Sequence, residues 1–144
     1  MPDFIDYDQI CLDLQAGIQG ADLGFQTVLN DANDRDFLID KMPLLDIRIK
    51  QMNPDARTNT SYYTDITVEC EVCAYSLVSR RDAAKMRSDL TNKLQAWVKA
   101  NRRFGANIET TFIGQGTFGT GESKAKGAFV AGAVLEFHVQ LYTE

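Results

Sequence analysis

The chain has 144 residues, a formal net charge of −5 and a hydrophobic content of 44%. That length is typical of one domain with its own core, so we expect a single domain over 1–144. No apolar run approaches the ~18 residues that span a bilayer, and the acidic start is unlike a signal peptide, which favours a soluble intracellular protein. The acidic balance also disfavours tight nucleic-acid binding, which needs many phosphate contacts.

The first half of the chain predicts a helix followed by strands. Residues 6–19 carry apolar side chains at helical spacing, and the glycines near its end are expected to stop the helix: Tyr7, Ile10, Cys11, Leu14 and Ile18, then Gly17 and Gly20. Residues 25–29 could form a short strand, and the acidic residues 30–36 favour turns. Alternation then predicts a strand from Pro43 to Lys50, a loop at 53–61 and a strand at 62–77.

The second half predicts one long helix and a closing hairpin. Ser79 and Asp82 resemble a capping box at the helix start, and Gly105 marks the helix end. Apolar residues repeat every three to four positions between them: Ala83, Met86, Leu90, Leu94 and Trp97. Strands are expected at 107–113 and 128–142. The sequence thus predicts an α+β fold with one antiparallel sheet of about four strands, a mixed sheet remaining open, and both helices on one face.

The segment from Gly114 to Gly127 contains five of the ten glycines of the chain. Glycine loses the most conformational entropy on folding, so we expect a long hairpin arm that stays mobile until a partner orders it. Within this arm, Phe118 is the expected apolar anchor. The candidate partner contacts are Gly114, Thr117, Phe118, Lys124 and Lys126.

Charge is unevenly distributed along the sequence. Residues 1–79 carry a net charge of −9, whereas residues 80–103 carry +6. Four basic residues fall on the helix face opposite its apolar stripe: Arg81, Lys85, Lys99 and Arg103. Two interpretations stay open, a solvated outer face or a ridge between subunits that meets the acidic segment 31–40 of a neighbouring copy.

Motifs for catalysis or metal binding are not found. Cys70 and Cys73 belong to an alternating strand, where residues three apart face opposite sides, so we expect two ordinary half-buried cysteines. His138 is the only histidine, and a zinc site would need more ligands. The glycine-rich segment lacks the Gly-Lys-Ser/Thr order of a phosphate-binding loop. We therefore expect neither an enzyme nor a cofactor.

The overall pattern resembles the tail terminator, or tail completion, proteins of long-tailed bacteriophages. The features that carry the resemblance are the Pro-led strand after a first helix (42–49), the long alternating strand (63–75), the capped helix with Leu90, Leu94 and Trp97, and the closing hairpin. The resemblance implies a structural virion protein at the tail–neck junction, assembled in the host cytoplasm. It would form a homo-oligomeric ring, expected to be hexameric, and have the tail tube and the head–tail connector as partners.

Such a ring would end tube polymerisation and let DNA pass without specific binding, so its lumen is expected to be neutral or negative. The alternatives are another phage neck or tail-tube component and a small α+β ligand-binding or enzymatic module.

Overall fold

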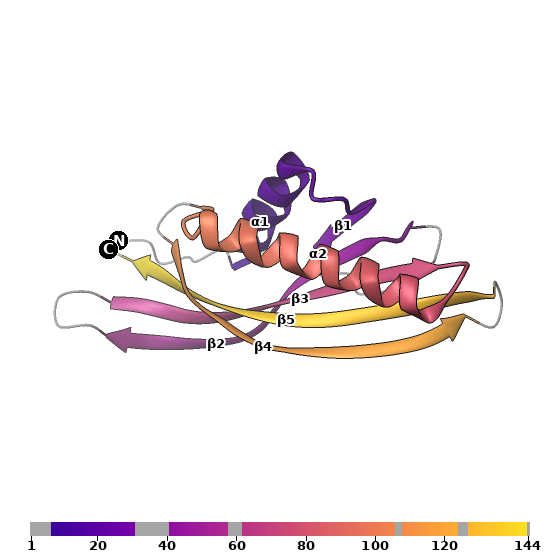
Figure 1. The fold of residues 1–144 in the computed structure, drawn as a ribbon. Helices are drawn as coiled ribbons and strands as arrows, with labels where there is room; N and C mark the ends of the chain where they lie inside the picture. The colour runs from indigo at the N-terminus through magenta and orange to yellow at the C-terminus, as the bar shows by residue number, and fades with distance from the viewer. Residues whose placement is uncertain (1–6, 31–40, 58–61, 106–107, 124–126, 144) are drawn as a thin grey trace.

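The computed structural model describes residues 7–30, 41–57, 62–105, 108–123 and 127–143. Two helices and five strands follow one another in the described chain (Figure 1). They are α1 (Tyr7–Ala21), β1 (Thr27–Asn30), β2 (Leu44–Arg57), β3 (Tyr62–Ser76), α2 (Arg80–Ala100), β4 (Ile108–Ser123) and β5 (Ala128–Thr143).

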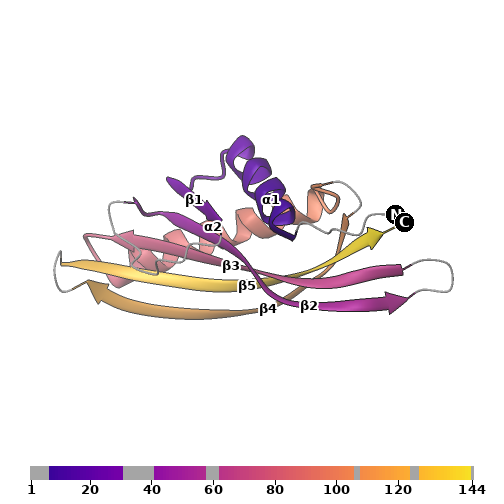
Figure 2. The ribbon, with the colours of Figure 1, turned by 180° about the vertical axis from the view of Figure 1, so that it is seen from behind.

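The described strands form one curled sheet in the order β1-β2-β3-β5-β4 (Figures 1 and 2). β1 runs parallel to β2, and the other neighbouring pairs are antiparallel. The prediction of about four antiparallel strands was therefore wrong, because the sheet is mixed and has at least these five strands. The short stretch expected at 25–29 is the additional strand, which the structure has as β1.

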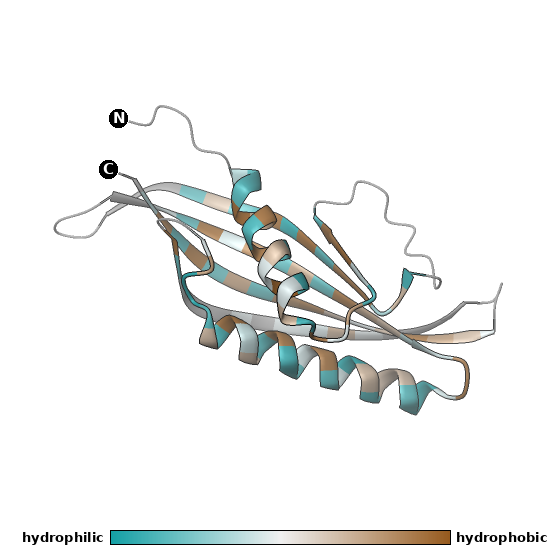
Figure 3. Cartoon of the chain, turned by 90° about the horizontal axis from the view of Figure 1, so that it is seen from above, coloured by the Kyte–Doolittle hydropathy of each residue, from teal (hydrophilic) through white to brown (hydrophobic). Residues whose placement is uncertain are grey.

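Both helices lie on one face of the sheet, as predicted (Figures 1 and 3). α1 covers β1 and β2, and α2 lies along β3 and β5. The core lies between the sheet and the helices. Alternating apolar residues of β3 and β5 pack against the apolar stripes of the two helices. The largest fully buried side chains include Phe137, Leu14, Ile18, Ile47, Ile66 and Leu94.

The start of α2 follows the sequence prediction. The Ser79 hydroxyl accepts a hydrogen bond from the Asp82 backbone N–H at 3.1 Å, which satisfies one of the unpaired donors of the first turn. The helix ends earlier than expected, at Ala100. Asn101 caps it by donating backbone and side-chain hydrogen bonds to the carbonyl oxygen of Trp97.

Gly17 and Gly20 were expected to end α1, but both lie within the helix. The helix continues to Ala21, and Asp22 then adopts a left-handed conformation with φ of 52°. A Cβ atom on Gly17 would lie 2.6 Å from the indole ring of Trp97. Gly17 is therefore explained by the close approach of α1 to α2 at this point.

The loop predicted at 53–61 was wrong for residues 53–57, which belong to β2, and residues 58–61 lie outside the described residues. β2 runs through Pro54 to Arg57, and its pairing with β3 shifts register between Asn53 and Ala56. Proline is tolerated at bulges and on strand edges, so the turn signal of the Asn-Pro-Asp sequence was overridden by pairing with β3.

The glycine-rich arm is the largest correction. Residues 114–123 form the last ten of the 16 residues of β4, and Gly116–Ser123 pair with β5 up to Ser123 opposite Ala128. A Cβ atom on Gly116 would lie 2.9 Å from a methyl group of Leu135, so one glycine is required by close packing. The expected long loop was wrong, and a deletion of 116–123 would remove half of the 16-residue strand β4.

Candidate interaction surfaces

The sheet has two outer edges, and the described residues leave much of each without a partner strand. β1 pairs only with Leu44–Ile47, so the outer edge of β2 from Arg48 to Arg57 is unpaired within the described chain. On the other side, β4 is a terminal strand and pairs with β5 alone among the described strands. Unpaired backbone groups at a sheet edge are a template for pairing with another chain.

Among the side chains that the structure describes, each of these two edges carries one that is large, apolar and exposed. Met52 on β2 is 47% exposed and Phe118 on β4 is 64% exposed. Met52 pairs with the buried Ile66, and Phe118 pairs with the buried Ala133. Because directly paired residues share a face, both exposed side chains point to the helix-covered side of the sheet.

Phe118 is held in place by α2 rather than by a partner. The guanidinium of Arg87 lies 4.9 Å from the centre of the Phe118 ring, a cation–π contact. Nη1 of Arg87 also donates hydrogen bonds to the carbonyl oxygens of Gly119 at 2.9 Å and Gly132 at 3.5 Å. Arg87 thus ties the glycine-rich half of β4 to the helix within one chain. Sequence reasoning missed it because Arg87 looks like one more base on a basic helix.

Of the five candidate arm residues, the structure places three on β4. Thr117 and Phe118 are exposed and Gly114 is partly buried. Lys124 and Lys126 lie outside the described residues. The three described positions follow one another along a strand, so they form part of a sheet edge instead of a flexible loop.

The four ridge residues are solvent-exposed, as either interpretation of the ridge requires. Arg81, Lys85 and Lys99 share one side of α2. Arg103 follows the helix end, and its guanidinium lies 3.7 Å from Glu109. At ~1.5 Å per residue, Lys85 and Lys99 are about 21 Å apart along the helix, so the ridge consists of two separate basic spots. The acidic segment 31–40 lies outside the described residues.

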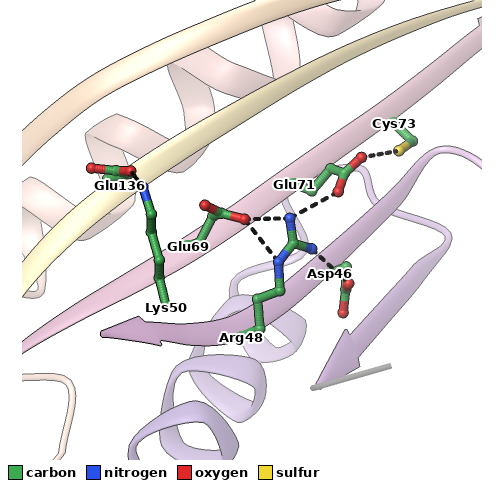
Figure 4. Close-up of polar contacts among 7 residues, drawn as sticks. All are labelled: Asp46, Arg48, Lys50, Glu69, Glu71, Cys73 and Glu136. Atoms are coloured by element: carbon green, nitrogen blue, oxygen red, sulfur yellow. Dashed lines mark hydrogen bonds and ion pairs between the residues drawn. The ribbon is translucent and has the colours of Figure 1, made fainter. Parts of the chain in front are cut away.

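The face opposite the helices carries a charged network centred on Arg48 (Figure 4). Its guanidinium donates hydrogen bonds to Asp46 at 2.9 Å, to Glu71 at 3.0 Å and, through Nε at 2.8 Å, to Glu69. Asp46 is only 1% exposed. Burial lowers the pKa of Arg48, but the hydrogen bonds and charges of Glu69 and Glu71 outweigh burial and raise that pKa above its ordinary value.

A second ion pair extends the charged network of Arg48 across the sheet. Lys50 contacts Glu136, which joins β2 to β5 over the intervening β3 (Figure 4). The bond with Glu136 raises the pKa of the Lys50 ammonium. Together these residues form a charged strip of four acids and two bases with a net charge of −2. Its members are Asp46, Arg48, Lys50, Glu69, Glu71 and Glu136.

The cysteines occupy opposite faces, as predicted, and are more deeply buried than expected. Cys70 lies in the main core, whereas Cys73 lies with Met42 and Leu44 in a small cluster on the other face. Burial raises the pKa of Cys73 to about 12, and the charge of Glu71 adds to this shift. Both thiols are thus protonated at neutral pH and poorly suited to nucleophilic or metal chemistry. Among the described residues, no group of acids, histidine and cysteines is arranged to hold a metal ion.

One shallow pocket lies between the end of α1 and β1. Its lining includes Ile18, Leu23, Phe25 and Val28, with Asp22 at its edge, and its volume is about 100 Å³. Sites for small molecules generally occupy about 300–1,000 Å³. This pocket is therefore too small for a typical metabolite.

No family model matches the chain, and no curated protein is detectably similar to it in sequence. In the described part of the chain, no helix is both long and apolar enough to cross a membrane.

Proposed function

We propose that this chain is a structural subunit of a bacteriophage tail terminator ring, expected to contain six copies, which caps the tail tube and joins it to the neck. The observation that carries the proposal is that the described residues leave two different sheet edges without a partner strand, one on β2 and one on β4. Two different edges on the same subunit favour a heterologous contact, which closes into a ring when the rotation between copies is suitable. The size and element order support the same class.

The charge of the helix-free sheet face agrees with a channel that passes DNA. The charged strip defined above is net negative, and its two bases are already bound to carboxylates. A surface of this kind offers few free cations to phosphate groups, so DNA would slide past without sticking. If this face lines the ring, the isolated protein should not bind duplex DNA at physiological salt.

The function is tested by the mass and shape of the purified protein. We expect six copies per particle by native mass spectrometry and annular particles by electron microscopy, either alone or after addition of purified tail tubes. A protein that stays monomeric or dimeric with and without tubes would contradict the proposal. So would a ring that fails to block further growth of tubes from tube subunits.

The basic ridge gives a second prediction about assembly. The double variant Lys85→Glu, Lys99→Glu should lower the yield of rings severalfold at low salt, because opposite charges across an interface are attractive and steer association. The ridge residues are exposed, so the melting temperature should stay near that of the native chain. Lys41→Glu, an exposed base outside α2, serves as the control. An undiminished ring yield would assign the ridge to an ordinary solvated helix face.

A further inference from the structure

The stretches of β2 and β4 that lack a partner among the described strands match each other in length. On β2, the stretch beyond β1 runs from Arg48 to Arg57, which is ten residues. On β4, the glycine-rich half runs from Gly114 to Ser123, also ten residues. Register shifts interrupt β2 at Ile49/Gln51 and Asn53/Ala56, and bulges of this kind are frequent at sheet edges and barrel rims.

The edges also match in direction. β2 is antiparallel to β3, β3 to β5, and β5 to β4. β4 therefore runs opposite to β2. If a second copy continues the sheet in the same orientation, its β2 lies antiparallel to the β4 of the first copy. Antiparallel pairs give the straighter and slightly more stable hydrogen-bond ladder.

The two edges also match in their pleat, because Met52 and Phe118 point to the same face of the sheet. Their positions along the strands must therefore differ by an even number of residues. Met52 is level with Ile66 on β3, which is level with Val139 on β5, whereas Phe118 is level with Ala133 on β5. Val139 and Ala133 are six residues apart. A sheet continued with Phe118 opposite Met52 of the next copy would therefore keep every buried side chain on the same face.

The offset agrees with closure of the sheet. Six residues correspond to about 20 Å along a strand, and the four strands β2, β3, β5 and β4 span about 19 Å across the sheet at ~4.8 Å each. The resulting strand tilt is about 45°, at the upper end of the range of about 35–45° found in closed barrels. In this register Gly114–Glu122 lies opposite Arg48–Ala56, so nine of the ten residues of each stretch are used.

We infer that neighbouring copies are joined by antiparallel pairing of Gly114–Ser123 on one copy with Arg48–Arg57 on the next, with Phe118 packed against Met52 across the junction. This inference rests on the proposed ring and specifies its subunit contact. The Arg87 contact supports it because it holds Phe118 in position before the second copy arrives, which lowers the entropic cost of association.

Engineered cysteines test the contact directly. The native cysteines are all buried, so new exposed thiols can be cross-linked selectively. Under mild oxidation or with a short thiol cross-linker, Met52→Cys, Phe118→Cys in one chain should give a ladder of covalent multimers that ends at the ring. The two single variants mixed together should stop at dimers. Leu12→Cys combined with Phe118→Cys is the matched control, since Leu12 is 45% exposed on α1 and should yield no ladder.

The outcomes separate this contact from the proposed function. A ring without the 52–118 cross-link overturns the contact and leaves the function standing. A 52–118 ladder in open filaments instead of rings supports the contact and overturns the function. A monomer with no cross-link overturns both. For the unmodified chain, hydrogen exchange should slow by tenfold or more at both 48–57 and 114–123 on assembly, and unchanged exchange at either stretch would overturn the contact even if a cysteine variant misfolds.

Discussion

Replacing Arg48 with methionine should destabilise the chain by about 2–4 kcal/mol, somewhat less than the ~3–5 kcal/mol for breaking a fully buried ion pair, because the two glutamates are partly exposed. The substitution keeps an apolar stem but removes the guanidinium that binds the buried Asp46 together with Glu69 and Glu71. For a chain of this size, that loss corresponds to a fall in the melting temperature of roughly 5–15 °C. Thermal or urea unfolding at pH 7 measures it.

The cause of this loss can be isolated with two further variants. Lys50→Met removes the exposed ion pair with Glu136 on the same strand and should leave melting nearly unchanged. Asp46→Asn added to Arg48→Met should recover part of the loss, because the buried charge is removed. No recovery in the Asp46→Asn, Arg48→Met double variant would show that Arg48 acts through packing alone.

Gly17 and Gly20, three residues apart in α1, should respond to alanine in opposite directions. Gly17→Ala should cost about 1–3 kcal/mol, because its Cβ would lie 2.6 Å from the Trp97 ring and force the two helices apart. Gly20→Ala should stabilise the chain by about 0.4–1 kcal/mol, since no atom lies within 4 Å of the added methyl group and the unfolded chain loses freedom. Urea unfolding measures both changes.

A double-mutant cycle identifies the contact responsible. Trp97→Phe removes the ring atoms nearest to Gly17, so Gly17→Ala should cost at least 1 kcal/mol less in that background. Trp97 is the only tryptophan, and its fluorescence in Gly17→Ala should report the displaced ring. Equal costs in both backgrounds, or a destabilising Gly20→Ala, would contradict the packing argument.

Those elements with a strong apolar period were predictable from the sequence. The alternation in β3 and β5 and the three-to-four-residue spacing in α2 identified these elements within a few residues, since burial of one face decides them. The Ser79 cap was also readable, because the capping hydrogen bond is local. The predictions failed for segments whose residue types favour turns but which pair with a neighbouring strand in the structure.

Glycine and proline caused the two main errors. Gly114–Ser123 and Asn53–Arg57 look like loops because these residues favour turns, yet both pair with long neighbouring strands. One signal was available: the last strand was expected to span 128–142, more than twice the length of its predicted partner at 107–113. A long strand requires pairing along most of its length, which could have extended β4 through the glycines.

The charged surfaces were predictable in part. Alternation placed Arg48 and Lys50 on a polar face, but only the register between β2 and β3 brings Arg48 between Glu69 and Glu71. Likewise, the contact of Arg87 with Phe118 depends on α2 crossing back over β4. Such long-range contacts leave no trace in a single sequence. The proposed ring contact has the same character, because it depends on strand offsets that the structure supplies.

In the sequence, α2 and β4 separate β3 from β5, and this separation has a consequence for how the chain folds. β2 with β3, and β4 with β5, are hairpins that can form from neighbouring residues. The central pairing of β3 with β5 joins segments as distant as Tyr62 and Thr143. A long loop must therefore close, at a cost in conformational entropy, before the contacts of this pairing can form. Folding should therefore be limited by the meeting of two preformed hairpins. The expected time is that of mixed α/β domains, between the microseconds of helical bundles and the seconds of slow β proteins.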